Sequence, residues 1–441
     1  MPTLRDLTRA GLWMGLYVLL ALWPLLLLLA APAPSGGLSD ELGSALGFLA
    51  ISMMAMQFLL TARFEWMAPP FGTDLLYAFH RNVTIAVLVF ALLHPVALFG
   101  ASLGMALGWL VPGAAPWEIA SGIWATYALV ALAITSWLRK RLKLPYEAWR
   151  WAHGPLAAAA VLLAIWHAVL AGRLLSRPVV RWLWLVWTLG WVALILRVRV
   201  FKPLALRRRP WLVREVRPEP GDSVTLVLEP EGHEGFRFRS GQFVWLTLGD
   251  SPLAGREHPF SIASSPLAWP RVELTIKAIG DFTRRALSTR VGERAYLDGP
   301  FGTMSIDAFP DADGYVFIAG GSGIVPCMSM LRTLADRGDR RPHLLLYGSG
   351  ELSRTIFREQ LEALSARLDL RVVHVLEKPP PGWRGEQGYL TQAMLDRWLP
   401  HRGRHAYFVC GPGPMMDIAE QALARLGVPF SDLHSERFDL V

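Results

Sequence analysis

Apolar residues dominate the first part of the chain. From about residue 11 to residue 200 the sequence consists mainly of Leu, Ala, Val and Trp, whereas the remainder reads as an ordinary water-soluble protein. A helix needs about 20 apolar residues to cross the roughly 30 Å hydrocarbon core of a bilayer. The pattern therefore predicts six membrane-spanning helices, at residues 11–31, 42–60, 75–100, 119–137, 152–172 and 182–200.

The first of these segments has a second interpretation. Ala31-Pro-Ala33 looks like the small-residue cleavage site of a signal peptide. The apolar stretch before it, about 20 residues, is longer than a typical signal core, which favours a retained helix. Its removal would leave the orientation of the other segments unchanged.

The second half of the chain has the pattern of strands and turns. A strand pattern begins near residue 241, and the runs at 315–320, 343–347 and 406–409 are typical of buried parallel strands. The run at 315–320 leads into a glycine turn and then a helical pattern. This alternation predicts an α/β domain at the carboxyl end.

The distribution of charge indicates an orientation in the membrane. The chain has 44 Lys and Arg against 36 Asp and Glu, and its strongest basic runs, at 139–143 and 197–209, flank apolar segments. Such runs mark cytoplasmic loops and argue against a nucleic-acid surface. The loops at 32–41 and 101–118 lack Lys and Arg. We therefore expect the second half in the cytoplasm, beneath an inner or plasma membrane, although Arg173, Arg177 and Arg181 run against the trend.

Four histidines stand in the apolar half, in two pairs of equal spacing. His80 and His94 are 14 residues apart, and so are His153 and His167. Fourteen helical residues span about 21 Å and return to the same face. Because both helices would run outward, His80 pairs with His153 on the inner side and His94 with His167 on the outer side. A single histidine on an apolar face is usually a core residue, but matched pairs inside a membrane predict ligands for two haems.

Neighbouring residues are compatible with these haems. Ala157–Ala160 lie midway between His153 and His167 and would leave room beside a porphyrin, or serve ordinary helix packing. Arg81 and Arg150 on the inner side, and Arg173 on the outer side, could pair with haem propionates. Interfacial snorkelling explains these arginines equally well.

Several short motifs follow in the second half. They are His258-Pro-Phe-Ser261, Lys277-Ala-Ile-Gly-Asp-Phe-Thr283, Gly299-Pro-Phe-Gly302, Gly321-Ser-Gly-Ile-Val-Pro326 and Cys410-Gly-Pro. A strand that ends in a glycine turn before a helix lets a pyrophosphate approach bare backbone amides. Each motif alone is more often a turn than a site. Their number and order favour a site.

The series resembles the ferredoxin–NADP reductase type of dehydrogenase. Joined to paired-histidine spans, the whole resembles the flavocytochromes that include NADPH oxidases and ferric-chelate reductases. The resemblance implies an all-α six-helix transmembrane domain with two b-type haems (1–200), an antiparallel β-barrel that binds FAD (201–308) and a doubly wound α/β domain that binds NADPH or NADH (309–441).

The resemblance also implies roles for single residues. His258, Pro259, Phe260 and Ser261 would hold the flavin, with the Ser261 hydroxyl near the ring nitrogen that accepts hydride. Lys277, Gly280 and Thr283 would serve the FAD phosphates. The pyridine nucleotide would contact Gly321, Gly323, Pro326, Cys410 and Gly411. Phe438 would cover the flavin face until the nicotinamide arrives.

Some of these residues have simpler interpretations. Phe438 could be a core aromatic, and Cys410 could be a small buried residue at a strand end. Cys410 and Cys327 are the only two cysteines, which excludes a disulfide framework and suits a reducing compartment. Ser349 and Arg354 could bind a 2′-phosphate, whereas Glu351 would repel one. The sequence thus favours NADPH slightly and leaves dual use open.

The implied function is electron transfer from cytoplasmic NAD(P)H through FAD and the haems to an acceptor on the outer face. Oxygen, reduced to superoxide, is the first candidate acceptor and a ferric chelate the second. Animal-type oxidases carry a further histidine one turn after the outer ligand, where this chain has Leu98. A third possibility is an electron donor that docks a periplasmic protein, although the outer loops are short; a colourless nucleotide-sensing membrane protein is a fourth. The sequence identifies no protein partner.

Overall fold

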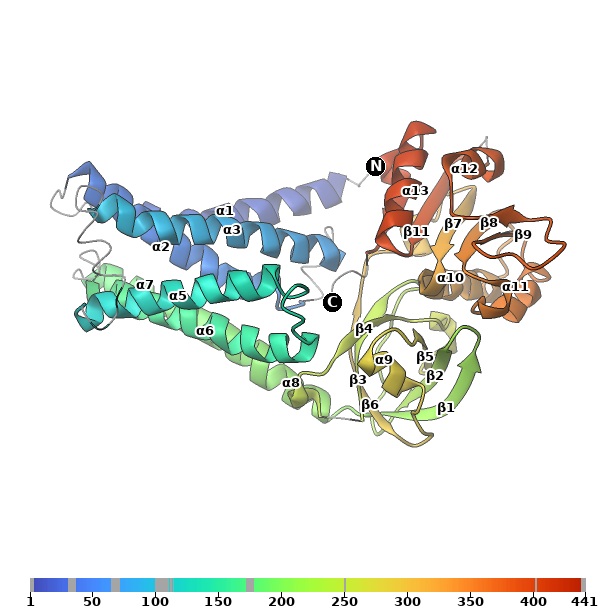
Figure 1. The fold of residues 1–441 in the computed structure, drawn as a ribbon, viewed down its shortest axis with the longest axis horizontal. Coiled ribbons are helices and arrows are strands. Elements are labelled where there is room, and N and C mark those ends of the chain that lie inside the picture. The colour runs from blue at the N-terminus through green and yellow to red at the C-terminus, as the bar shows by residue number, and fades with distance from the viewer. Residues whose placement is uncertain are drawn as a thin grey trace. The chain divides into compact units, whose positions relative to one another are not determined.

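The computed structural model describes residues 4–30, 37–64, 72–99, 111, 113, 115–171, 178–249, 251–400 and 403–437 (Figure 1). These residues form two compact units. One comprises Leu7–Phe64 and Leu75–Pro203, and the other continues from Leu204 onward.

The first unit consists of long helices that run alongside one another (Figure 1). Within the described residues, six helices are long and apolar enough to cross a membrane. This confirms the predicted number of spans. The helices are α1 (Leu4–Ala30), α2 (Leu38–Leu60), α3 (Gly72–Phe99), α5 (Trp117–Trp137), α6 (Tyr146–Ala171) and α7 (Pro178–Leu196).

Burial in this unit differs from that of a soluble bundle. Its outward faces expose large apolar side chains, such as Trp182 and Val179, which are 66% and 71% exposed. Its interior is apolar as well and includes Ala55, Val87 and Trp184. Exposed apolar faces of this extent require a lipid environment. The unit is therefore a membrane domain.

The chain leaves α7 through an irregular segment. A π-helical turn, Arg197–Phe201, follows α7, and the short helix α8 (Lys202–Arg207) follows the turn. π-helical turns are rare and frequently mark functional positions. This one carries the basic residues that the sequence places after the sixth span.

The second unit begins with an antiparallel sheet whose strand order is β4-β3-β6-β1-β2-β5. A bridge between Ile262 and Leu274 joins its two edges and closes a barrel. Apolar side chains such as Leu226, Leu246 and Leu274 fill the interior. The strands are β1 (Trp211–Glu219), β2 (Ser223–Pro230), β3 (Phe243–Leu248), β4 (His258–Ser261), β5 (Val272–Lys277) and β6 (Arg294–Phe301), with the short helix α9 (Asp281–Ala286) after β5.

A parallel sheet of order β10-β9-β8-β7-β11-β12 completes this unit. Its strands are β7 (Gly314–Gly320), β8 (His343–Ser349), β9 (Leu370–Leu376), β10 (Glu386–Gln387), β11 (His405–Cys410) and β12 (Leu433–Ser435). Helices α10 (Ile324–Asp336) and α11 (Arg358–Ser365) pack on one face, and α12 (Gln392–Trp398) and α13 (Gly413–Arg425) on the other. This confirms the predicted doubly wound fold.

Polar contacts join the barrel to the parallel-sheet domain. Arg332 on α10 donates hydrogen bonds to the carbonyl of Ala263 at 2.9 Å and to the Glu273 carboxylate at 2.8 Å. Ser329 on the same helix donates to the carbonyl of Ser264 at 2.7 Å. Helix α10 therefore rests on the segment that follows β4, and this contact places the glycine turn before α10 against the barrel.

Candidate functional site

The histidine pair predicted for the outer side, His94 on α3 and His167 on α6, lies close together in the structure. The ring centroids of His94 and His167 are 6.1 Å apart, with the ring planes at 78°. A metal–imidazole bond is about 2 Å long and a ring nitrogen lies roughly 1 Å from its ring centre, so two imidazoles on opposite sides of one metal have centroids about 6 Å apart. The observed separation fits a shared metal.

Hydrogen bonds fix the protonation of both rings. Nδ1 of His94 lies 2.7 Å from the carbonyl oxygen of Gly43 on α2, and Nδ1 of His167 lies 2.6 Å from that of Glu118 on α5. A carbonyl only accepts, so each Nδ1 carries the proton and donates. This leaves the lone pair of Nε2 available, which is the arrangement typical of metal-ligating histidine.

Glycines give both imidazoles their room. A Cβ atom on Gly47 would lie 2.8 Å from Nδ1 of His94, and one on Gly122 would lie 2.9 Å from Nδ1 of His167. Both glycines stand four residues after the residue whose carbonyl accepts the hydrogen bond. Helices α2 and α5 thus support the two histidines in the same way. These glycines were not predicted from the sequence, because their i, i+4 spacing from Gly43 and Glu118 has no meaning until the carbonyl acceptors are known.

The inner histidines occupy the next level on the same two helices. His80 and His153 interact electrostatically, and Nδ1 of His153 lies 3.4 Å from the Ser136 hydroxyl. The Nδ1 atom of His80 is buried, and no hydrogen bond reaches it within the described residues. A buried imidazole nitrogen without a hydrogen-bond partner fits a residue that holds a bound group.

The midpoint between the two levels is closely packed. Val87 and Ala160 each stand seven residues from both histidines of their helix, and both are fully buried. Seven residues are about two helical turns, so these side chains share the histidine face. The two histidine levels are therefore separated by packed apolar side chains.

Basic residues near the inner level differ in part from the sequence prediction. Arg81 is exposed and Arg150 is half-buried, while Arg173 lies outside the described residues. The structure adds Arg199 from the π-helical turn. Its guanidinium lies 3.7 Å from the position of a Cβ on Gly154, and it interacts electrostatically with His153. The basic run at 197–209 was the available signal.

In the barrel, two of the predicted flavin motifs meet. The His258 ring packs against Phe282 with centroids 4.3 Å apart, and Phe260 lies parallel to Phe282 at 5.9 Å. Ser261 ends β4 and is 9% exposed; Pro259 lies between Phe260 and His258 on the same strand. The structure thus adds Phe282 to the aromatic group, which sequence reasoning had passed over inside its own motif.

Thr283 is occupied by the turn before α9. Its hydroxyl accepts from the backbone N–H groups of Ile279 and Gly280, both at 2.8 Å, and donates to the carbonyl of Gly280 at 3.0 Å. The side chain therefore fixes the conformation of the loop at Ile279 and Gly280. A direct phosphate contact would require it to give up one of these bonds.

Lys277 reaches from the barrel toward the parallel-sheet domain. Its Nζ lies 3.9 Å from the position of a Cβ on Gly321. Gly321 has φ +55°, in the left-handed region that favours glycine. Its carbonyl accepts from the hydroxyl of Tyr347 at 3.1 Å. The cation therefore stands beside the glycine turn of the next domain as well as at the end of β5.

The two glycine motifs of the parallel sheet meet at the carboxyl ends of β7 and β11. A Cβ on Gly323 would collide with the carbonyl oxygen of Cys410, and one on Gly411 would lie 3.1 Å from the Cα of Gly320. Pro326 is buried in the first turn of α10. In parallel sheets of this kind, ligands bind outside the carboxyl ends of the strands.

Cys410 lies beneath this junction. It is 1% exposed, and burial raises the pKa of its thiol well above the usual value; burial likewise raises the pKa of the Cys327 thiol to about 12. Both thiols are consequently neutral at physiological pH. Cys410 is therefore a small buried residue at a strand end, and it lies next to the site predicted for the nicotinamide.

Glu436 is a buried acid that sequence reasoning missed. It is 6% exposed, and its Oε1 accepts from the backbone N–H of Thr303 at 2.9 Å. It also interacts electrostatically with Cys410. The carboxylate thus lies between the Gly299-Pro-Phe-Gly302 loop and the end of β11. Its position directly after the short strand β12 gave no apolar or periodic pattern from which its burial could be predicted. Phe438, two positions later, lies outside the described residues.

The residues predicted to select the nucleotide lie at the end of β8. The Ser349 hydroxyl is 3.0 Å from that of Thr355, and Arg354 forms an ion pair with Asp222 at 2.5 Å. Asp222 belongs to the β1–β2 turn of the barrel. The Arg354–Asp222 pair is exposed on both sides, so Arg354 links the two domains without being buried.

Two family profiles match the chain. "Ferric reductase like transmembrane component" matches residues 46–164, and "Oxidoreductase NAD-binding domain" matches residues 317–421. Ferredoxin–NADP reductase B of Sorangium cellulosum is 30% identical over 247 residues, which cover 53% of this chain and all of that protein. The chain belongs to the ferredoxin–NADP reductase family. It joins a dehydrogenase of this family to a ferric reductase-like membrane domain, which confirms the predicted architecture.

Other relatives share the dehydrogenase half. The stachydrine N-demethylase reductase subunit of Rhizobium meliloti is 32% identical over 227 residues, covering 50% of this chain and 64% of that protein. The solved structure of an Amycolatopsis cytochrome P450 reductase is 24% identical, with a TM-score of 0.47 over 52% of this chain and 69% of that one. This chain spans about three fifths of the length of the first curated relatives.

Family membership confirms several predictions at a coarse level. The ferredoxin–NADP reductase-type chain is an oxidoreductase, and FAD with a nicotinamide dinucleotide as cofactors agrees with its family. Its first half is a membrane domain.

Proposed function

We propose that this chain carries electrons from cytoplasmic NAD(P)H, through FAD and two bis-histidine b-type haems, to oxygen on the outer face, with superoxide as product. The outer histidine pair is the observation that carries the proposal. The two imidazoles stand on different helices with their ring centroids 6.1 Å apart. Their Nδ1 atoms are hydrogen-bonded to backbone carbonyls, which leaves their Nε2 atoms available to bind a metal.

The membrane domain supplies the ligands. His94 and His167 would hold the outer haem, and His80 and His153 the inner one; when bound, each haem iron exchanges single electrons. Gly47 and Gly122 keep the outer imidazoles in place, and Arg199 places a cation at the inner level, where a propionate would neutralise it. Because two histidines would hold each haem, we expect the acceptor to be reduced without binding to the iron.

The dehydrogenase half binds and orients the hydride donor. Lys277, which the sequence assigns to the FAD phosphates, also lies beside the turn at Gly321–Gly323. The cation and the bare backbone amides of the turn would together hold the pyrophosphate of the nicotinamide dinucleotide. Ser261 would lie beside the flavin ring. Glu436, fixed by the Thr303 N–H, would position the nicotinamide carboxamide from the side of Cys410.

A ferric chelate is the second candidate acceptor. Leu98, one turn after His94, packs against Gly43: a Cβ on that glycine would lie 2.6 Å from the leucine side chain. The position that would carry a further histidine in animal-type oxidases is therefore filled by an apolar contact. This favours an outer surface without a dedicated oxygen site. Docking of a periplasmic protein remains the third candidate.

Haem content tests the membrane part of the proposal. The purified chain, expressed with haem supplementation, should show a Soret band and two haems per FAD. His94→Leu and His167→Leu should each lose the same haem, and His80→Leu and His153→Leu the other. A His233→Asn control in the barrel should keep both. A colourless protein, or unchanged haem content in the four variants, would refute the histidine pairing.

The acceptor requires a separate measurement. NADPH-driven oxygen consumption and superoxide yield should be measured with and without a ferric chelate, against His94→Leu. Superoxide formation that the variant abolishes supports the oxidase. Chelate reduction that suppresses oxygen consumption supports the ferric reductase. If neither oxygen nor the ferric chelate is reduced faster by the unaltered protein than by His94→Leu, both assignments are wrong. Protease accessibility in sealed inner-membrane vesicles would test the sidedness.

A further inference from the structure

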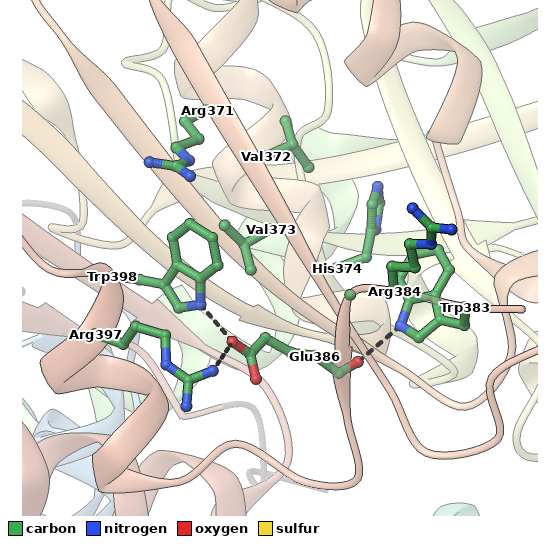
Figure 2. A pocket seen from close by; sticks show the side chains of 10 residues that line it. Arg371, Val372, Val373, His374, Trp383, Arg384, Glu386, Arg397 and Trp398 are labelled. Carbon is green, nitrogen blue, oxygen red and sulfur yellow. Dashed lines mark hydrogen bonds and ion pairs between the residues drawn. The ribbon is translucent and has the colours of Figure 1, made fainter.

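A cavity of about 380 Å³ lies at the outer edge of the parallel sheet. It is bounded by β9, by the segment that leads to β10, and by the carboxyl end of α12 (Figure 2). Small-molecule sites commonly measure about 300–1,000 Å³. The cavity is therefore large enough for a ligand of one or two rings.

Glu386 holds two indole rings at this cavity. Its Oε1 accepts from Nε1 of Trp398 at 2.8 Å, and its backbone carbonyl accepts from Nε1 of Trp383 at 3.1 Å. Figure 2 shows the two indoles on opposite sides of Glu386. Because both N–H groups bond to one residue, both indoles are held in place beside the cavity. Fixed aromatic side chains suit a planar ligand.

Two guanidinium groups at the cavity have no carboxylate partner within the described residues. Arg371 lies over the Trp398 ring at 4.2 Å, and Arg384 extends beside Trp383 (Figure 2). By contrast, Arg397 forms an ion pair with Glu386 at 2.6 Å. Burial lowers the pKa of His374, which is therefore neutral at physiological pH. The cavity consequently presents two uncompensated positive charges.

The cavity is distinct from the place predicted for the hydride donor. The glycine turns lie at the carboxyl ends of β7 and β11. The contact between Trp398 and Arg371 instead joins the carboxyl end of α12 to the amino end of β9. In addition, β10 pairs only with Val375 and Leu376 of β9, so no described strand covers the earlier part of this edge. A dinucleotide at the glycine turns would leave the cavity open.

We propose that this cavity binds a nucleoside phosphate other than the hydride donor. Its base would enter the cavity that Trp383 and Trp398 line, and its phosphate would meet Arg371 and Arg384. Guanidinium groups suit this role because their planar fork binds phosphate through paired hydrogen bonds. The inference depends on neither the haems nor the electron acceptor.

The experiment uses ADP as the probe. Binding to the purified full-length protein is measured by calorimetry at saturating NADP⁺, so that the dinucleotide site is filled. One ADP should bind per chain. Adenosine and inorganic phosphate should each bind at least about tenfold more weakly, because each makes only one of the two kinds of contact.

Substitutions locate the site. Arg384→Ala and Arg371→Ala should each weaken ADP binding about tenfold and leave NADP⁺ affinity unchanged. The matched control is Arg367→Ala, which removes an exposed arginine of the same domain that pairs with Asp336. No ADP binding at saturating NADP⁺, or equal binding by Arg384→Ala, would overturn the proposal. Binding of an acidic peptide in place of ADP would make the strand edge a protein-docking surface and would equally overturn it.

Discussion

The two halves of the molecule prepare their candidate sites by opposite means. In the membrane domain, side-chain nitrogens on helices are the candidate functional groups, and His94 and His167 meet because each helix carries its histidine at the same level. In the dehydrogenase half, the backbone itself is presented. Gly321 adopts φ +55°, and Gly323 packs directly on the carbonyl of Cys410.

This difference decides where a substitution is felt. A helix fixes its side chains at a regular period, so the membrane site depends on what supports each ring. A glycine turn depends on the closest approach of two chain segments, so it tolerates no added atom. Glycines recur in both halves, but they make room for an imidazole in the membrane domain and for backbone in the dehydrogenase half. Alanine substitutions should therefore have different effects in the two halves.

The largest effect is expected for Gly323→Ala. Its new Cβ would overlap the backbone oxygen of Cys410, which cannot rotate away. Overpacking of this kind costs about 1–3 kcal/mol, and a backbone obstacle places it at the upper end. The variant should melt at a lower temperature by differential scanning fluorimetry and lose NADP⁺ binding.

Gly350→Ala is the matched control for this variant. Nothing lies within 4 Å of the position of a Cβ on Gly350. Its melting temperature should therefore stay close to that of the unaltered protein. Equal stability of the two variants would show that the backbone at the ends of β7 and β11 can move to accept a methyl group. The glycine turn would then not be the less tolerant of the two sites.

A smaller effect is expected for Gly122→Ala. The new Cβ would lie 2.9 Å from Nδ1 of His167, and the imidazole can move aside where backbone cannot. The fold should survive, while the outer haem is lost in part or shows an altered reduction potential. Spectroelectrochemical titration measures this. Gly190→Ala, with nothing within 4 Å, should match the unaltered protein; a shift of the same size in both would mean that the glycine does not support His167.

Periodic features were predictable from the sequence, and meetings of distant segments were not. The six spans follow from apolar runs, and the histidine levels follow from a spacing of 14 residues, because a helix converts spacing into position. Glu436 could not be placed in the same way, since its meeting with Thr303 joins residues 133 positions apart. The support of His94 by Gly43 likewise depends on how α2 packs on α3, which spacing within either helix does not encode.

Buried thiols predict a pH dependence confined to the dehydrogenase half. Burial raises the pKa of Cys410 and Cys327 in the folded protein. The unfolded chain, with thiol pKa values of about 8.5, therefore loses these protons first, and stability falls as the pH rises above that value. The loss amounts to about 1.4 kcal/mol per pH unit for each thiol. Cys410→Ala should reduce the slope of melting temperature against pH between pH 8.5 and 10; an unchanged slope would mean that the thiol ionises freely in the fold.

The smallest effect is expected for Arg354→Ala. Its ion pair with Asp222 is exposed, with 53% and 68% of the two side chains accessible. Such pairs contribute about 0–1 kcal/mol, so the guanidinium can leave Asp222 for a 2′-phosphate at little cost. The substitution should raise KM for NADPH about threefold to tenfold and leave KM for NADH unchanged. Asp222→Asn is the informative partner: it frees the guanidinium and should lower KM for NADPH slightly. If Arg354→Ala affects both nucleotides equally, the residue serves only to join the barrel to the parallel-sheet domain, and the choice of nucleotide is made elsewhere.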